Sequence, residues 1–195
     1  MSVRIDPSSL ASAHARAYLE SRLRTVPDFP KPGVMFKDIT PLLADTRALH
    51  IALDLLAEPF IGEGLSYIVA MEARGFIFGG ALAARLNVGF VPVRKPGKLP
   101  ADSDAVYYAL EYGEGVLHMH KGSVSPGSRV LIVDDLLATG GTAAAAAELV
   151  HKQRGIVAGF AFVVELDFLA GRKRLATATS QGTLVHSLIR FPAEG

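Results

Sequence analysis

The chain is organised around one segment, Val130-Leu131-Ile132-Val133-Asp134-Asp135-Leu136-Leu137-Ala138-Thr139-Gly140-Gly141-Thr142. It begins with four apolar residues rich in β-branched side chains, which is typical of a buried strand. Asp134 and Asp135 follow where such a strand would reach the edge of its sheet. A glycine-containing loop then leads into good helix formers at 143–149. A strand, a glycine-rich turn and a helix start form a common phosphate site, because free backbone N–H groups and the helix dipole face the anion.

The composition of this loop excludes the two commonest phosphate-binding motifs. No Lys follows the glycines, and no G-x-G-x-x-G opens the helix. The two acids repel phosphate, so their natural partners are neutral hydroxyls or a metal. A ribose 5-phosphate would suit both halves, with its ring hydroxyls on Asp134 and Asp135 and its phosphate on the amides of Ala138, Thr139, Gly140, Gly141 and Thr142. The alternative is an ordinary turn with a capping Thr, which needs neither two acids nor two glycines.

The segment resembles the phosphoribosyl diphosphate (PRPP) motif of the type I phosphoribosyltransferases. The form DDLLATGGT is most similar to that of the adenine phosphoribosyltransferases. Further motifs in the expected order extend the resemblance over roughly residues 27–175. It implies an enzyme that converts adenine and PRPP to AMP and diphosphate. It also implies a homodimer and a Mg²⁺ cofactor, held mainly through PRPP and without direct protein ligands.

The composition sets limits on domain number, location and partners. A chain of 195 residues predicts one domain, 1–195, with a substantial core. Its 19 acidic and 20 basic residues nearly cancel, which argues against a nucleic acid or a membrane surface as the main partner. The absence of cysteine excludes disulfides and Cys-ligated metals. Without a visible signal peptide or a membrane-length apolar run, a soluble cytoplasmic protein is expected.

The N-terminal region, 8–41, is predicted to hold a helix at 8–26 and then a proline-rich loop. Phe36, between Met35 and Lys37, could offer a flat face to an aromatic ligand. The residues alone favour a proline-stiffened loop packed on the core. The resemblance identifies this loop with the adenine-binding segment of the family. It implies that Phe36 stacks on the purine while the backbone of Met35 and Lys37 reads the base edge.

A second strand–loop–helix unit carries Arg74. A strand at 67–70 precedes Glu72-Ala73-Arg74-Gly75, and a helix at 76–86 is predicted to end at Asn87. An Arg can hold two oxygens of a diphosphate at once, although an Arg before a helix is also often only a surface charge. The resemblance matches this loop to the one that grips diphosphate, which makes Arg74 a catalytic candidate. A further helix is predicted at 46–57, capped by Asp45.

The region 94–120 resembles the family's flexible lid. Arg94, Lys95 and Lys98 follow a strand at 90–93, and could form a solvated turn or half of a diphosphate clamp. Residues 101–106 suit a flexible tip, and strands are predicted at 107–112 and 116–120. The resemblance assigns Arg94 and Lys98 to the diphosphate. A lid would expel water from a reaction with a cation-like transition state.

The same resemblance assigns the acid–base chemistry to the lid. In 6-oxopurine relatives an acid in the phosphate loop is thought to help deprotonate the base, and here that position is Ala138. This departure argues against hypoxanthine and guanine and requires another acid. We expect Glu111, with Tyr112 beside it, to relay a proton at the imidazole side of adenine.

The remaining segments add a strand at 156–164, which Glu165 and Leu166 follow, and a last strand at 183–189. The resemblance implies that Leu166 contacts the base. His118 and His120 alternate on one strand face like a metal pair, but no third ligand is nearby in the sequence. The basic run at 172–174 is typical of a solvated helix face.

Alternating strands and helices predict an α/β fold, with a mainly parallel central sheet flanked by helices and a small hood or lid. Ligands of such sheets bind beyond the carboxyl ends of the strands, where Arg74, Asp134 and Glu165 are expected.

Two alternatives remain for the function. One is an enzyme of the same fold that acts on xanthine, orotate or another nucleobase. The other is a non-catalytic PRPP-sensing regulator, which would be expected to add a DNA-binding segment or a basic face.

Overall fold

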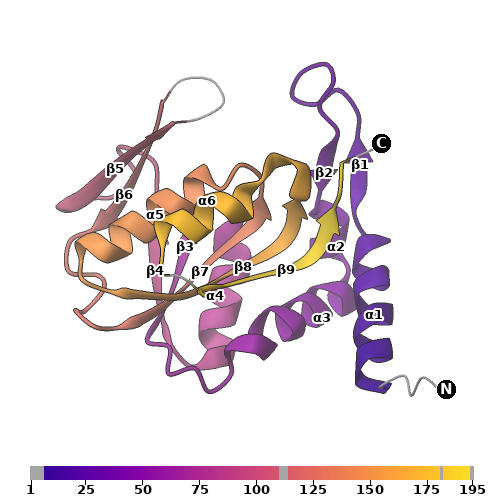
Figure 1. Ribbon diagram of the computed structural model, residues 1–195, viewed down its shortest axis with the longest axis horizontal. Coiled ribbons are helices and arrows are strands. Elements are labelled where there is room, and N and C mark those ends of the chain that lie inside the picture. Colours follow the sequence, from indigo (N-terminus) through magenta and orange to yellow (C-terminus); the bar gives the residue numbers. More distant parts are fainter. Residues whose placement is uncertain (1–6, 110–113, 181, 194–195) are drawn as a thin grey trace. The chain divides into compact units, whose positions relative to one another are not determined.

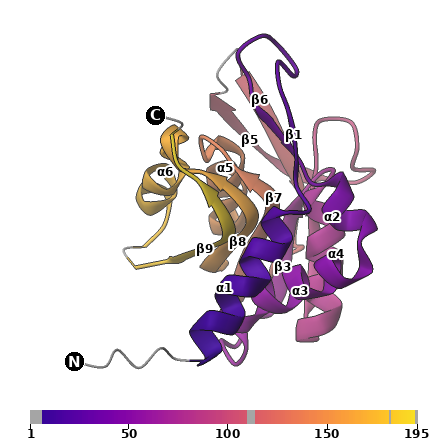
Figure 2. The same cartoon turned by 90° about the vertical axis from the view of Figure 1, so that its right-hand side faces the viewer.

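The computed structural model describes residues 7–109, 114–180 and 182–193, with the backbone alone for 7–11 (Figures 1 and 2). The chain divides into two compact units, Met1–Leu55 and Leu56–Gly195. The single domain predicted for residues 1–195 stays a prediction. Among the described residues, no helix combines the length and the apolar character that crossing a membrane requires.

The first unit contains helices and a small hairpin. Its elements are α1 (Pro7–Glu20), β1 (Arg24–Val26), β2 (Phe36–Asp38), α2 (Thr40–Ala44) and most of α3 (Thr46–Ala57). The predicted helix 8–26 was wrong at its C-terminal end, because α1 stops at Glu20 and β1 pairs antiparallel with β2. Val26 precedes Pro27, and the proline ring disfavours the helical conformation at that position. The predicted cap of α3 is confirmed, since Asp45 Oδ1 accepts a hydrogen bond from Ala48 N at 3.0 Å.

The second unit is built on a five-stranded sheet in the order β4-β3-β7-β8-β9. All neighbouring strands are parallel, which confirms the predicted fold class. The strands are β3 (Tyr67–Met71), β4 (Gly89–Val93), β7 (Arg129–Leu137), β8 (Ile156–Leu166) and β9 (Leu184–Phe191). The helices are α4 (Gly75–Leu86), α5 (Gly141–Lys152) and α6 (Gly171–Ala178), with short 3-10 turns η1 (Glu58–Phe60) and η2 (Asp167–Leu169).

Helices cover both faces of this sheet. In Figure 1, α5 and α6 lie in front of the strands and α4 behind them. Alternation along β3 explains the two layers, because Ala70 packs against Gly79 of α4 while Val69 and Met71 join the buried cluster that includes α5 residues. Parallel strands that are buried on both faces have continuous apolar sequences. These strands could therefore be predicted from the sequence.

The central strand is longer than predicted. Asp134 and Asp135 lie inside β7, and Asp134 pairs with Phe162 of β8. On the other side, pairing of β7 with β3 extends only to Val133. The acids therefore mark the point where β7 loses one neighbour, rather than the end of the strand itself. Glu165 likewise lies inside β8 instead of following it.

An antiparallel hairpin, β5 (Ser103–Ala109) and β6 (Glu114–His120), occupies the predicted lid region. The flexible tip expected at 101–106 was wrong from Ser103 onward, because Asp104 and Val106 pair with Met119 and Leu117. Burial of the Val106 side chain gives this part of the hairpin an apolar anchor. Residues 110–112 of the predicted strand 107–112 lie outside the described residues. Backbone hydrogen bonds in both directions between Arg94 and His118 join β6 to the end of β4.

Candidate active site

The segment that organises the sequence forms a pocket at the carboxyl end of β7. The cavity has a volume of about 210 Å³. Ligand pockets for drug-sized molecules usually measure about 300–1,000 Å³, so this one suits a group the size of a sugar phosphate. It is lined by Arg74, Asp134, Asp135, Leu136, Leu137, Ala138, Thr139, Gly140, Gly141, Thr142 and Ala143.

The pocket lies at the start of α5, where the loop enters the helix. Gly140 is the N-cap of α5 and has a left-handed φ of 77°. A Cβ at this position would lie 2.7 Å from the carbonyl oxygen of Gly171. The first N–H groups of a helix have no acceptor within the helix, and Gly141, Thr142 and Ala143 border the cavity. The loop therefore presents backbone donors and the positive end of a helix dipole to an anion.

The acid pair lies beside this loop, against Arg74. Arg74 Nε is 2.6 Å from Asp135 Oδ2, and the Asp135 side chain is only 8% exposed. Asp135 N donates to Asp134 Oδ1 at 3.0 Å. Burial, followed by the neighbouring Asp135 charge, raises the pKa of Asp134 well above its ordinary value, although Arg74 opposes the shift. The Asp134 carboxyl therefore tends to keep its proton, and both acids can bind hydroxyl groups.

Asp134→Asn is expected to stabilise the unliganded protein at neutral pH. A raised pKa means that the folded state binds more protons than the unfolded state above about pH 4. The free energy of unfolding of the wild type therefore falls as pH rises through this window, by up to about 1.4 kcal/mol per pH unit. Asn keeps the oxygen that accepts from Asp135 N but cannot ionise.

Denaturant unfolding of the wild type and the Asp134→Asn variant between pH 4 and pH 8 measures this effect. The stability difference should be near zero at pH 4 and grow with pH in favour of the variant. A difference that stays constant over this range would contradict the raised pKa.

Comparisons with known proteins identify the family. Residues 43–183 match the family model described as the phosphoribosyl transferase domain. A protein of Sorangium cellulosum named adenine phosphoribosyltransferase is 66% identical over 193 residues, which cover 99% of this chain and 96% of that protein. The chain belongs to the adenine phosphoribosyltransferase family.

Solved structures of adenine phosphoribosyltransferases share the fold. The enzyme of Rhodothermus marinus superposes with a TM-score of 0.85 at 48% identity, covering 92% of this chain and 99% of that one. The Saccharomyces cerevisiae enzyme, solved with adenine and an imino-altritol bisphosphate, gives a TM-score of 0.82 at 40% identity and covers 90% and 99% of the two chains. The type I phosphoribosyltransferase fold implied by the sequence motifs is therefore confirmed.

The structure brings one group of predicted site residues together. Arg74, the two acids and the loop 138–142 line a single pocket, although they come from two separate strand–loop–helix units. The peptide bond between Glu72 and Ala73, directly before Arg74, is cis. Their roles as ligands of PRPP stay predictions, and the shared pocket supports them.

The two other predicted diphosphate ligands lie outside the described lining of this pocket. Arg94 Nε donates to Glu72 Oε2 at 2.8 Å, and its Nη1 donates to the carbonyl oxygen of Lys98 at 3.0 Å. Glu72 Oε1 also accepts from Lys95 N. Glu72 thus fixes the end of β4 and the loop that follows, a role that the sequence did not suggest. The Lys98 side chain is exposed.

The predicted base-site residues belong to both compact units, and each is described within its own unit. Phe36 begins β2 in the first unit, where its ring makes an edge contact with Phe29 at a centroid distance of 5.1 Å. Met35, beside it, is 44% exposed, and Lys37 Nζ donates to Thr25 Oγ1. Leu166 ends β8 in the second unit. Glu111 and Tyr112 lie outside the described residues. The roles of all these residues in binding or deprotonating adenine stay predictions.

The two histidines on β6 have partners within the hairpin region. His118 Nδ1 lies 2.9 Å from Ser103 Oγ, and His120 Nδ1 lies 3.4 Å from the carbonyl oxygen of Asp102. In the described parts of the chain, no group of three or more His, Cys, Asp or Glu side chains could hold a metal ion. These contacts tie both histidines to the residues that begin the hairpin.

Among the described residues, three that were not predicted as site residues also shape the pocket. A Cβ on Gly75 would lie 2.6 Å from Asp134 Oδ1, so α4 can approach the acids only because it begins with glycine. Thr142 Oγ1 donates to the Tyr108 hydroxyl at 3.5 Å, which links the loop to β5. Gly171 packs against the loop backbone from α6. Only Gly75 could have been found from the sequence, because it follows Arg74 directly. The contacts of Tyr108 and Gly171 with the loop depend on the tertiary fold.

Proposed function

We propose that the chain transfers the 5-phosphoribosyl group of PRPP to adenine, giving AMP and diphosphate. The observation that carries this proposal is the pocket in which backbone amides at a helix start lie beside an acid pair whose second member, Asp135, is buried. Relatives up to 66% identical are named for this activity. The reaction is part of purine salvage, because it converts a free base into a nucleotide.

The ribose phosphate occupies the pocket in this proposal. The amides of Ala138 to Thr142 bind the 5-phosphate, and Asp134 and Asp135 bind the ring hydroxyls. Positive charge builds on the ribose as the bond to diphosphate breaks, and the nearby carboxylates favour that charge. Binding of the phosphate and of the hydroxyls also fixes the anomeric carbon for attack by a ring nitrogen of the base.

The leaving diphosphate meets the cationic side chains. Arg74 contacts Asp135, and its guanidinium group can bind two phosphate oxygens at once. Arg94 and Lys98 complete the proposed set, which requires Arg94 to exchange its contact with Glu72 for one with the diphosphate. Stabilising the negative charge that develops on the leaving group lowers the barrier.

The residues present fit a Mg²⁺ ion that arrives with PRPP. Mg²⁺ is usually bound by one or two carboxylates together with substrate phosphates, rather than by a protein cage. Asp134 and Asp135, the carboxylates of the pocket, bind the ribose hydroxyls in this proposal, so the ion would be held mainly through PRPP and without direct protein ligands. When bound, the ion would supply positive charge to the diphosphate.

The base completes the proposed complex. Phe36 stacks on adenine, the backbone of Met35 and Lys37 reads its edge, and Leu166 contacts it. Ala138 provides no acid at the position that 6-oxopurine relatives use, which supports adenine over hypoxanthine and guanine. Tyr112 belongs to the lid that closes over the reactants.

Glu111→Gln is expected to lower kcat about 100-fold while the KM for PRPP stays close to the wild-type value. The expected reason is that Glu111 relays the proton that adenine loses, and general acid–base catalysis contributes about 10²–10⁴-fold. Steady-state kinetics with a Glu114→Gln variant, which removes a nearby acid in the sequence, gives the matched control. Wild-type turnover by Glu111→Gln would remove this residue from the mechanism.

A homodimer and a cytoplasmic location belong to the same proposal. The family resemblance implies the dimer, and a chain with nearly balanced charges tolerates self-association. A chain without cysteine has no need of an oxidising compartment. Sedimentation of the purified protein measures the oligomeric state directly.

Incubation with PRPP, Mg²⁺ and one nucleobase at a time tests the function. Adenine should yield AMP and diphosphate, whereas hypoxanthine, guanine, xanthine and orotate should yield little product. Faster conversion of another base would overturn the assignment to adenine and favour the enzyme of the same fold. Binding of PRPP without turnover of any base would instead indicate a regulator.

A further inference from the structure

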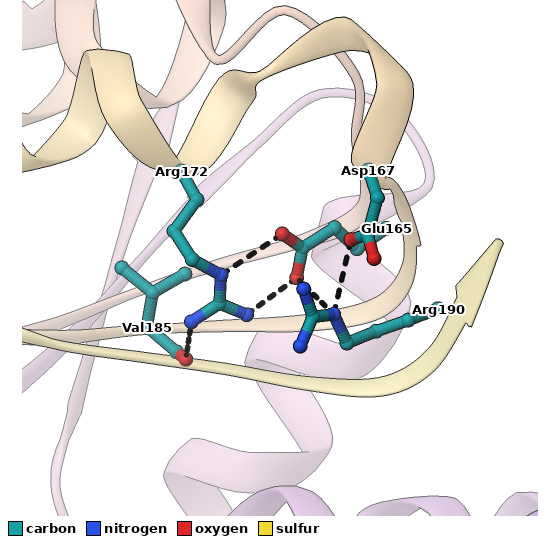
Figure 3. A network of polar contacts seen from close by, with 5 residues as sticks. All are labelled: Glu165, Asp167, Arg172, Val185 and Arg190. Atoms are coloured by element: carbon teal, nitrogen blue, oxygen red, sulfur yellow. Dashed lines mark hydrogen bonds and ion pairs between the residues drawn. The ribbon is translucent and has the colours of Figure 1, made fainter. Parts of the chain in front are cut away.

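An ionic cluster around one buried carboxylate lies near the ends of β8 and β9, outside the described lining of the phosphate pocket (Figure 3). Its centre is Glu165, whose side chain is 2% exposed. Arg172 of α6 holds both carboxylate oxygens, with Nε 3.0 Å from Oε1 and Nη2 2.5 Å from Oε2. Arg172 Nη1 also donates to the carbonyl oxygen of Val185 at 2.6 Å. One guanidinium thus ties the first turn of α6 to two strands.

The cluster is charge-balanced. Arg190 Nε lies 3.0 Å from Asp167 Oδ1 and 3.7 Å from Glu165 Oε2, so two cations face two carboxylates. Burial alone would raise the pKa of Glu165, but the hydrogen bonds and charge of Arg172 lower it overall. Glu165 therefore remains ionised although it is buried. The proposed reaction assigns this carboxylate no chemical role.

The residue before Arg172 supports the phosphate loop. A Cβ on Gly171 would collide with the carbonyl oxygen of Ala138 and lie 3.1 Å from Gly140 N. Conversely, a Cβ on Gly140 would lie 2.7 Å from the carbonyl oxygen of Gly171. The two backbones are in direct contact, so a shift at the start of α6 would move the loop. Glu165 itself pairs in register with Leu137, immediately before the loop.

We propose that the Glu165–Arg172 ion pair is a positioning device for the phosphate loop, because it holds Gly171 against Ala138 and Gly140. This inference rests on the proposed function, since it assumes that the loop binds the phosphate of PRPP and AMP. Arg172 touches neither the pocket nor the substrate in this account. It acts through Gly171, so its loss should weaken binding of the phosphate group selectively.

The test compares AMP with adenosine, which lacks the phosphate, by calorimetry on the full-length chain. Arg172→Met should weaken AMP binding by about 10- to 100-fold, the effect expected when a supporting group lets a site shift by a fraction of an ångström to an ångström. Adenosine binding should stay at the wild-type level. Arg172→Lys keeps the charge but loses the two-pronged contact, so it should restore part of the AMP affinity.

Two further variants control for folding and for charge. The double variant Glu165→Gln with Arg172→Met removes the ion pair without leaving a buried carboxylate unpaired. It should lose AMP affinity to the same extent as Arg172→Met and keep its affinity for adenosine. Arg190→Met removes the other cation of the cluster, which is not part of α6, and should bind AMP normally. Equal weakening of AMP and adenosine, or unchanged AMP binding by both Arg172→Met and the double variant, would overturn the proposal.

The wild type separates this inference from the proposed function. Wild-type protein that binds AMP and converts adenine, combined with an Arg172→Met variant of unchanged AMP affinity, overturns only the positioning role. Wild-type protein that binds neither AMP nor PRPP overturns the proposed function, and the positioning role with it.

Discussion

Arg74→Met should lower kcat by about 100- to 1,000-fold. Removal of one group that stabilises developing negative charge typically has an effect of this size. Arg74 Nε lies 2.6 Å from Asp135 Oδ2, and the side chain is 45% exposed, so it can reach a ligand from the edge of the acid pair. Its loss would remove the charge that meets the leaving diphosphate and would leave Asp135, only 8% exposed, without this partner.

Steady-state kinetics with saturating adenine and PRPP measures this effect. Arg85→Met is the matched control, because Arg85 lies in the last turn of the same helix, α4. It should leave kcat unchanged. Arg74→Lys keeps a cation but cannot hold two oxygens in one plane, so its kcat should fall between those of the wild type and Arg74→Met. Turnover by Arg74→Met at the wild-type rate would exclude Arg74 from the chemistry.

Gly140→Ala should lower kcat/KM for PRPP by about 100- to 10,000-fold. Ala would adopt a left-handed φ near 77°, and its Cβ would lie 2.7 Å from the carbonyl oxygen of Gly171. Since that contact is with backbone, the loop itself must move. Hydrogen bonds to charged groups contribute about 1.5–3 kcal/mol each, and displacement of two amides from the phosphate would account for the expected loss.

Gly127→Ala separates the steric effect from the conformational one. Gly127 has the same φ of 77°, but nothing lies within 4 Å of a Cβ placed there. Both variants should lose about 1–2 kcal/mol of stability from the left-handed backbone. Only Gly140→Ala should lose affinity for PRPP and AMP. Normal AMP binding by Gly140→Ala would show that the loop does not hold the phosphate.

The sequence predicted those elements whose signals are local. The strands of the sheet are continuous apolar runs, and the helix at 46–57 was found with its correct bounds and its Asp45 cap. Asn87 was expected to end α4 and does so with a left-handed φ of 55°. The phosphate loop was found because glycines, acids and a helix start occur in one continuous segment.

The errors arose where distant residues decide the structure. Residues 24–26 form a strand only because 36–38 lie beside them. The acids fall inside β7 because β8 continues past the point where pairing with β3 stops. Gly171 supports a loop about thirty positions earlier in the chain, and the Glu165–Arg172 pair depends on where α6 begins. No period or motif encodes such contacts.

A crystal structure of the wild-type protein with AMP tests the central claim most directly. We expect the phosphate within hydrogen-bond distance of the backbone N–H groups of residues 139–142, and the ribose hydroxyls on the carboxyl groups of Asp134 and Asp135. A nucleotide whose phosphate lies elsewhere, or whose ribose makes no contact with either acid, would contradict the account.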